Sequence, residues 1–174
     1  MKLTMTSWLG NLPEDAVYDT IESPIGRLLV IVSRKGVHAL ISASDEEAST
    51  LMEMLPHDSG QPILVQVRAQ LAEYFGGRRR RFDLPLVLEG TEFQKQVWSE
   101  LAKIPYGETI SYGEQARRIG KPNAMRAVGG ANGRNPISII IPCHRVIGAD
   151  GGLTGFGWGT HNKKTLLDLE RRYG

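Results

Sequence analysis

Cysteine is almost absent from this chain of 174 residues, which contains only Cys143. One thiol excludes an internal disulfide and any cysteine-rich zinc site. The four histidines, His38, His57, His144 and His161, show no metal-ligand spacing either. A lone free thiol suits a reducing compartment.

Long apolar runs are also missing, since no stretch approaches the roughly 18 apolar residues needed to span a bilayer. The first residues turn acidic too soon to supply the apolar core of a signal peptide. A hydrophobic content of 41% with 23% charged residues is typical of a globular protein. We therefore expect a cytoplasmic protein with no membrane contact, built as one domain or two small ones.

Charge is unevenly distributed, although the net charge is only +2. Residues 1–90 carry 9 basic against 12 acidic residues, a net −3, whereas residues 91–174 carry 12 against 7, a net +5. Residues 112–145 hold six Lys and Arg against the single acid Glu114. The asymmetry indicates that the second half meets a polyanion, with chance segregation of surface charge as the alternative.

The first half has an α+β pattern. Residues 17–42 contain three runs rich in Val, Ile and Leu, separated by the turn signals Ser-Pro-Ile-Gly and Arg-Lys-Gly, and predict three short strands. A helix is expected from Asp45 to Leu55, and a second over 63–75, ended by two glycines. The arginine run 78–81 is interpreted as a solvated connection. We place a small α/β domain at 1–86 and a second domain at 87–174.

The second half predicts mostly helices. Thr91 is a plausible N-cap for a helix with apolar spacing up to residue 104. Ser111 is expected to cap residues 112–119 and Asn123 to cap 124–132, which together would form a helix-turn-helix. Gly129 and Gly130 cost helix stability, which favours a surface where a partner approaches the backbone closely.

Cys143 follows the β-branched run 137–141, which predicts a buried strand. Consecutive strand residues point to opposite faces, so Cys143 and His144 can cooperate only if the chain turns at Pro142. His144, Arg145 and a helix N-terminus would each favour the thiolate. A buried, inert cysteine remains the alternative.

A catalytic histidine also needs an orienting carboxylate. The candidates in this half are Glu92, Glu100, Glu108, Glu114, Asp150, Asp168 and Glu170. The glycine-rich stretch 148–159 suits a loop that wraps closely over a ligand.

Several segments, in order and with matching spacing, closely resemble the O6-alkylguanine-DNA alkyltransferases. In the second half these are FQKQVW, IPYGETISYGE, RAVGGANGRNP, IPCHRVIG, LTGFG and LLDLE. The first half resembles the family more loosely, through SPIGRL and the YFGG and FDLPL segments. The resemblance implies a ribonuclease H-like N-terminal domain with a small antiparallel sheet. It also implies a mostly helical C-terminal domain, with a helix-turn-helix and a short strand leading to the cysteine.

The resemblance implies DNA repair by a protein that acts once. The alkyl group of O6-alkylguanine, or of O4-alkylthymine, would pass irreversibly to Cys143 after the base is flipped out through the minor groove. The partner would be double-stranded DNA bearing the lesion, bound by a monomer without an obligate protein partner. No cofactor and no metal would be needed.

The same resemblance implies roles for individual residues. His144 would take the thiol proton through a water, Glu170 would hold His144, Tyr112 would protonate the departing guanine, and Asn135 would brace the turn before Cys143. Arg126 would fill the vacated space in the duplex. The remaining DNA contacts would come from Tyr112, Ala124, Met125, Ala127 and Gly129, and the base pocket from Val146, Gly155, Phe156 and Gly157.

Two positions depart from the family pattern: Phe156 stands where tyrosine is frequent, and Trp158 where glycine is frequent. Two rival functions remain. An inert alkyltransferase-like protein would bind the lesion without chemistry. A cysteine hydrolase would turn over repeatedly and ignore DNA.

Overall fold

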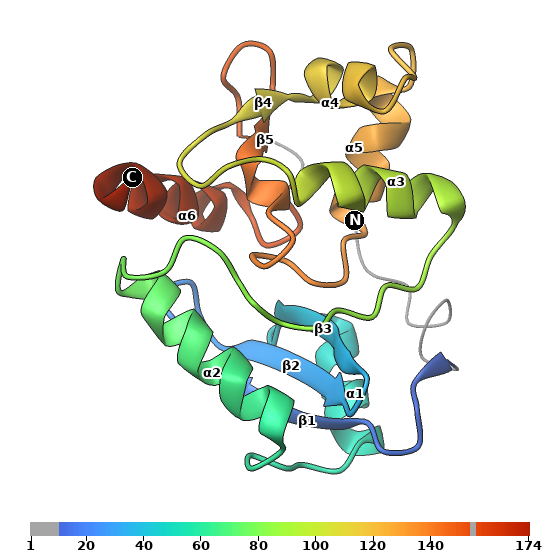
Figure 1. The fold of residues 1–174 in the computed structure, drawn as a ribbon, viewed down its shortest axis with the longest axis vertical. Coiled ribbons are helices and arrows are strands. Elements are labelled where there is room, and N and C mark those ends of the chain that lie inside the picture. The colour runs from blue at the N-terminus through green and yellow to red at the C-terminus, as the bar shows by residue number, and fades with distance from the viewer. Residues whose placement is uncertain (1–10, 154–155) are drawn as a thin grey trace. The chain divides into compact units, whose positions relative to one another are not determined.

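The computed structural model describes residues 11–153 and 156–174. The chain divides into two compact units, which meet in the sequence between Glu89 and Gly90. Each unit combines helices with a small sheet (Figure 1). In both described ranges, every helix is too short or too polar to cross a membrane.

The first unit is built on a three-stranded antiparallel sheet in the order β1-β2-β3. The strands are β1 (Val17–Ile21), β2 (Leu28–Ser33) and β3 (Gly36–Ser42), as the sequence predicts. All six residues of the central strand β2 are buried, which explains its unbroken apolar sequence. The sheet is therefore the core of this unit.

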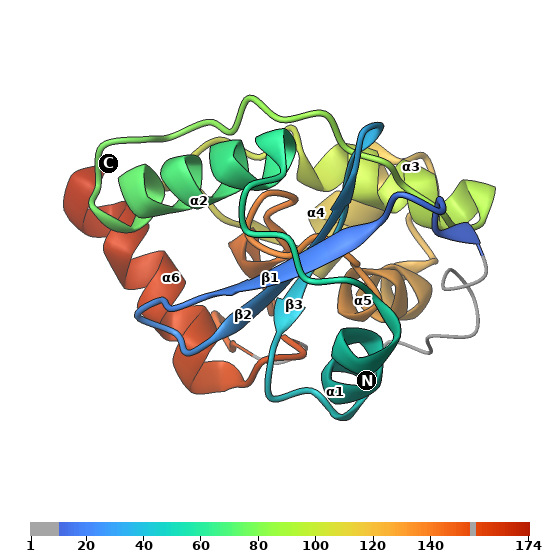
Figure 2. The same cartoon turned by 90° about the horizontal axis from the view of Figure 1, so that it is seen from below.

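Two helices complete the first unit, α1 (Glu46–Met54) and α2 (Pro62–Phe75). Asp45 caps α1 by accepting a hydrogen bond from the backbone N–H of Glu47. The longer helix α2 contacts all three strands and runs along the sheet (Figures 1 and 2). Its buried positions include Leu64, Val67 and Leu71, which recur at helical spacing.

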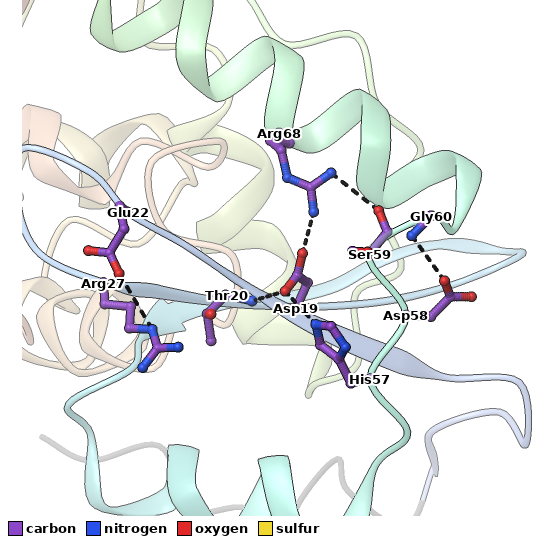
Figure 3. Close-up of polar contacts among 9 residues, drawn as sticks. All are labelled: Asp19, Thr20, Glu22, Arg27, His57, Asp58, Ser59, Gly60 and Arg68. Atoms are coloured by element: carbon purple, nitrogen blue, oxygen red, sulfur yellow. Dashed lines mark hydrogen bonds and ion pairs between the residues drawn. The ribbon is translucent and has the colours of Figure 1, made fainter.

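Asp19 on β1 ties two other segments to the sheet (Figure 3). Its carboxylate accepts hydrogen bonds from Arg68 on α2 and from Nε2 of His57, the latter at 2.8 Å. Burial opposes ionisation of Asp19, but the hydrogen bonds from His57, Thr20 and Arg68 outweigh it and lower the pKa of the carboxyl group. These three side chains link β1 to α2 and to the segment between α1 and α2 that carries His57.

The arginine run lies after α2, as a connection without helix or strand. Arg79 pairs with Glu73 at 3.0 Å and donates to the carbonyl oxygen of Arg81. Arg78, Arg80 and Arg81 are exposed. The structure thus agrees with the prediction of a solvated connection.

The second unit is mostly helical (Figures 1 and 2). Its elements are α3 (Glu92–Leu101), β4 (Ile110–Ser111), α4 (Tyr112–Arg118), α5 (Met125–Gly133), the 3-10 helix η3 (Cys143–Arg145), β5 (Val146–Ile147) and α6 (Thr160–Tyr173). β4 and β5 form a parallel pair. Thr91 caps α3 through a reciprocal capping box with Gln94, as its sequence predicts.

Helices α4 and α5 pack together as the predicted helix-turn-helix. Ser111 caps α4 through the backbone N–H of Glu114. Between the two helices, Gln115 and Asn132 are buried and exchange side-chain hydrogen bonds of 2.9 and 2.8 Å. Because each amide satisfies the other, this pair fixes how the two helices meet.

The predicted cap at Asn123 is wrong. Helix α5 begins one residue later than expected, with Ala124 as its N-cap and no side-chain cap hydrogen bond. The N–H of Ala124 instead bonds to the carbonyl oxygen of Lys121, at 2.9 Å. A hydrogen-bonded backbone turn therefore precedes the helix, and the N-cap is Ala124 rather than Asn123.

The predicted strand at 137–141 is also wrong. The segment holds no continuous strand: Ile137, Ser138 and Ile141 occupy isolated bridge positions, and Ser138 pairs with Ile141 across a tight turn. Ile139, at the turn, has a φ of 73°, and the N–H of Ile141 bonds back to the carbonyl oxygen of Ile137 at 3.0 Å. The β-branched run is buried as expected, but it packs as a folded loop rather than an extended strand.

Candidate active site at Cys143

Cys143 is the first residue of η3 and is nearly buried, with 7% of its surface exposed. Its backbone N–H bonds to the carbonyl oxygen of Ile141 at 2.8 Å. The chain therefore turns after Pro142, as it must if Cys143 and His144 are to avoid opposite faces of one strand.

The sequence led us to expect surroundings that favour the thiolate form of Cys143, but the structure shows the opposite. Burial raises the pKa of Cys143, although hydrogen bonds from Asn135 and Ser138 and the charge of Lys163 act against this rise. The resting group is therefore a protonated thiol rather than a thiolate at neutral pH. Chemistry at this sulfur requires a base that removes its proton.

Asn135 braces the turn in front of the cysteine. Its side-chain NH2 donates to the carbonyl oxygen of Ile141 at 2.8 Å, and its side-chain oxygen accepts from the N–H of Ile137 at 3.0 Å. Both ends of the turn are thus bound to one buried amide. This is the backbone contact expected for Asn135.

His144 and Glu170 form a buried pair, with Nε2 and Oε2 separated by 2.6 Å. Burial would raise the pKa of Glu170, but His144 and Arg145 together hold it far below its ordinary range. An ionised carboxylate only accepts hydrogen bonds, so Nε2 of His144 carries the proton. Burial lowers the pKa of His144, which leaves the ring neutral and Nδ1 as a free acceptor.

Nδ1 of His144 is buried and has no hydrogen-bond partner among the residues that the structure describes. A buried acceptor is costly to leave without a partner, so a water or a reacting group is expected to bind it. His144 sits beside Cys143 in the chain and belongs to the same short helix. A neutral imidazole and a protonated thiol are thus carried by neighbouring residues. Of the seven candidate carboxylates, Glu170 is the one bound to this histidine.

Arg145 does not act on the thiol as expected. Its guanidinium donates to Oε1 of Glu170 at 2.8 Å, to Oε2 at 3.1 Å and to the carbonyl oxygen of Ile104 at 2.6 Å. Gly107 donates its N–H to Glu170 at 3.2 Å. Glu170 is thus held from several sides, and it orients His144 rigidly.

Lys163 is a site residue that sequence reasoning missed. It is fully buried, donates to the carbonyl oxygen of Val146 at 2.5 Å and lies 5.7 Å from the centre of the Tyr112 ring. Burial lowers the pKa of Lys163, while the nearby Cys143 opposes this. In the sequence, Lys163 looks like a surface residue in a polar stretch at the start of α6, and no local signal marks it.

Tyr112 is half-buried on the first turn of α4. Burial raises its pKa, and the charge that Cys143 can carry raises it further. The phenol therefore keeps its proton at neutral pH and can donate it. Charge on Cys143 therefore affects the pKa values of both Tyr112 and Lys163.

The predicted DNA-binding residues lie on α5 or at its N-cap, except for Tyr112, which lies on α4. Met125, Arg126 and Ala127 are exposed, and Ala124 precedes them at the N-cap. A Cβ atom added to Gly129 would lie 3.8 Å from the Tyr112 ring, which is ordinary contact. At Gly130 the same atom would meet open space, so packing within the protein does not require that glycine.

The predicted base pocket is described only in part. Gly155 lies outside the described residues, and Gly157 is exposed. The rings of Phe156 and Trp158 are 5.7 Å apart. Val146 is buried in β5, where it pairs with Ile110, and its carbonyl oxygen already accepts from Lys163. Across 11–153 and 156–174, no group of three or more metal-ligating side chains gathers at one place.

Comparisons with known proteins connect this arrangement to a family. Residues 92–172 match the DNA binding domain of 6-O-methylguanine DNA methyltransferases, and residues 16–88 match the ribonuclease-like domain of the same proteins. A methylated-DNA–protein-cysteine methyltransferase of Mycolicibacterium paratuberculosis is 48% identical over 159 residues, covering 90% of this chain and 93% of the relative. One from Methanosarcina barkeri is 50% identical over 155 residues, covering 88% and 96%.

A solved structure agrees with both relatives. The crystal structure of Mycobacterium tuberculosis OGT in complex with DNA superposes with a TM-score of 0.82 at 46% identity, covering 90% of this chain and 94% of that one. Both domains and nearly the full length are matched, and the matched region includes the buried thiol with its His–Glu pair. The chain belongs to the 6-O-methylguanine DNA methyltransferase family.

Proposed function

We propose that this protein repairs DNA by transferring the alkyl group of O6-alkylguanine to Cys143, as a methylated-DNA–protein-cysteine methyltransferase. The bond between O6 and the alkyl carbon breaks as the bond from sulfur to that carbon forms. The thioether is stable, so each molecule acts once. O4-alkylthymine presents the same type of leaving oxygen and is the second lesion we expect.

His144 supplies the base for this reaction. Its Nδ1 takes the thiol proton through a bridging water, and Glu170 stabilises the imidazolium that forms. The single observation that carries the proposal is the free, buried Nδ1 atom of a neutral histidine whose other nitrogen is fixed by Glu170. An inert cysteine would not need this arrangement beside it.

Tyr112 supplies the acid. Its raised pKa keeps the phenol protonated, so it can donate to the departing guanine as negative charge develops there. The proton lost from Cys143 and the proton gained by guanine are thus handled by two different groups.

DNA is bound through α5, which we propose enters the minor groove. The small residues Ala127, Gly129 and Gly130 allow close approach to the sugar–phosphate backbone. The target atom is shielded in a duplex, so the base must leave the stack, and the exposed Arg126 fills the space that it leaves. Contacts go mainly to phosphate and sugar, so binding is salt-sensitive and nearly independent of sequence.

Cys143→Ala tests whether DNA binding and alkyl transfer depend on different residues. The variant should transfer no methyl group from an O6-methylguanine oligonucleotide. It should bind the same duplex with nearly the parent's Kd, because one sulfur atom adds little to binding that depends on phosphate contacts. The parent should consume one equivalent of lesion per molecule and then stop. A collapse of binding, or repeated turnover by the parent, would contradict the proposal.

Base flipping is tested with Arg126→Ala. We expect a larger loss of transfer rate on duplex DNA than on the free alkylated base, because only the duplex leaves a gap to fill. Arg81→Ala removes an equally exposed arginine from the first unit and is the matched control. Equal losses on both substrates would rule out an intrahelical arginine.

A further inference from the structure

Two buried amide side chains join the helices of the helix-turn-helix. Gln115 on α4 is 0% exposed and Asn132 on α5 is 4% exposed, and they exchange hydrogen bonds of 2.9 and 2.8 Å. Two amides that each donate to and accept from the other can pair fully in only one relative position of their helices. The proposed reaction assigns no role to either residue.

We propose that Gln115 and Asn132 are a positioning pair for base extrusion. They hold α4 and α5 in the one register in which Tyr112 and Arg126 act on the same nucleotide. The role rests on the proposed alkyl transfer and deepens it. It concerns the step that brings the damaged base out of the duplex rather than the chemistry of the sulfur.

The amide pair lies one helical turn from the residues that contact each other at the start of the interface. On α4, Gln115 follows Tyr112 by three residues, and on α5, Asn132 follows Gly129 by three. Residues three apart share one face of a helix. The helices also meet at the earlier turn, because a Cβ atom added to Gly129 would lie 3.8 Å from the Tyr112 ring. The amide pair and the Tyr112 contact therefore belong to one interface.

Arg126 lies one further turn back along α5. It precedes Gly129 by three residues and is exposed. Its neighbour Met125 reaches α4, because a Cβ atom added to Gly113 would lie 3.8 Å from the sulfur of Met125. A change in the register of α4 on α5 would therefore move Tyr112 relative to Arg126.

Apolar packing alone defines this interface weakly. The buried residues of α4 are Gln115 and Ala116, so an alanine is its one buried apolar side chain. Contacts between apolar side chains are non-directional, whereas amide hydrogen bonds require a defined distance and angle. Helix α5 is also held to α3, where Nε1 of Trp98 donates to the carbonyl oxygen of Ala131 at 2.9 Å. The amide pair thus places α4 on a helix that is already anchored.

The test replaces the amides by apolar side chains of similar shape, Gln115→Met and Asn132→Leu, singly and together. Single-turnover transfer is measured at saturating protein on an O6-methylguanine duplex and on free O6-methylguanine. Transfer on the duplex should slow about tenfold or more in all three variants, because a displacement of about 1 Å can cost up to ~100-fold in rate. Transfer from the free base should stay near the parent's rate, since a free base can follow a displaced Tyr112 and does not have to be extruded.

Urea unfolding separates positioning from stability. Each single variant leaves one buried amide without its partner and should lower the urea midpoint. The double variant should recover much of the midpoint, because two apolar side chains leave no polar group unsatisfied. A pair that only stabilises the fold would recover the duplex rate together with the midpoint, whereas a positioning pair leaves duplex transfer slow. The double variant also decides the question if a single variant does not fold.

Gln70→Met is the matched control from the first unit. The Gln70 amide is also buried and makes two hydrogen bonds, of 2.9 and 2.8 Å, to the backbone of Asp83. Its loss should lower the urea midpoint and leave both transfer rates unchanged. Extrusion itself is followed with 2-aminopurine at the lesion position, which fluoresces more strongly when it leaves the base stack. The parent and Gln70→Met should give the full fluorescence rise on binding, and the double variant a smaller one.

The outcomes are distinguishable from failure of the proposed function. If the parent transfers no methyl group but the double variant still weakens the 2-aminopurine signal, the positioning role stands and the repair function is wrong. If the parent gives neither transfer nor signal, both are wrong. If the parent transfers methyl groups and the double variant matches it on the duplex, the positioning role alone is wrong. Equal losses on the duplex and on the free base would also overturn that role, since they indicate general damage to the site.

Discussion

Each of the two units contains a carboxylate that is hydrogen-bonded to a histidine and to an arginine, but the two groups lie in different surroundings. On the first unit, Asp19 binds His57 and Arg68, and the His57 side chain is 55% exposed (Figure 3). On the second, Glu170 binds His144 and Arg145, and the His144 side chain is fully buried. In each trio a carboxylate joins a histidine to an arginine at hydrogen-bond distance.

The Asp19 trio and the Glu170 trio differ in how far their side chains are buried. In the first trio the carboxylate of Asp19 is buried, but the side chains of His57 and Arg68 are partly exposed and keep contact with water. In the second trio the guanidinium of Arg145 and the carboxylate of Glu170 have left water, and each depends on the other. The buried trio also fixes the tautomer of His144 and leaves Nδ1 buried without a hydrogen-bond partner among the described residues. The residue types are the same in the two trios, so the base that we propose at His144 depends on burial.

The largest expected effect comes from Glu170→Gln. It leaves the buried Arg145 without a counter-charge, which typically costs about 3–5 kcal/mol of unfolding free energy. Methyl transfer should also slow, because His144 loses the carboxylate that orients it. Urea unfolding and single-turnover kinetics measure the two effects. An unchanged rate at neutral pH would remove Glu170 from the mechanism.

His144→Asn should slow methyl transfer about 100-fold or more, the usual contribution of a general base. The Asn side chain cannot take the thiol proton. His57→Asn is the matched control on the exposed trio and should leave the rate unchanged. Comparable rates for the two variants in a single-turnover assay would erase the proposed difference between the trios.

Acid should destabilise the second unit through His144. Its pKa is lowered in the folded state, so the unfolded chain binds the proton more readily, and stability falls as pH drops below about 6.5. The depressed pKa of Glu170 adds a second loss, which begins as pH falls through about 4.3. Urea midpoints measured across this range test both steps. His144→Asn should reduce the first step and leave the part that comes from the lowered pKa of the buried His38, whereas His57→Asn should keep the whole step.

The smallest expected effect comes from Asp19→Asn. It removes the charge of the buried Asp19 carboxylate, but His57 and Arg68 are partly exposed and can bind water instead, so the cost should be smaller than that of Glu170→Gln. Methyl transfer should be unchanged. A loss as large as that of Glu170→Gln, seen in the same urea titration, would show that exposure does not account for the difference between the two trios.

Much of the architecture follows from local sequence rules. The strands at 17–42, the capping box at Thr91 and the cap at Ser111 depend on a few neighbouring residues, and each is found as predicted. The segment 137–141 shows where such rules fail. Consecutive β-branched residues are buried in a strand and in a folded loop alike, and nothing local reports the positive φ of Ile139.

The site is predictable only where its residues are close in sequence or carry a motif. Cys143 and His144 are neighbours. Glu170 is one of seven possible carboxylates by residue type, and before the structure placed it 2.6 Å from the histidine only the family resemblance singled it out. Lys163 was missed because a lysine near a helix start has an ordinary explanation as a surface residue. The pKa of Cys143 could not be predicted, because it depends on burial that only the fold determines.

The central claim is that the sulfur of Cys143 becomes the permanent acceptor of the alkyl group. Mass spectrometry of the protein after incubation with O6-methylguanine DNA tests it most directly. The account predicts that each molecule gains the mass of one methylene group, located by peptide mapping at Cys143 and absent from Cys143→Ala. An unchanged mass in protein that still binds the lesion would contradict it and would indicate a binder without chemistry.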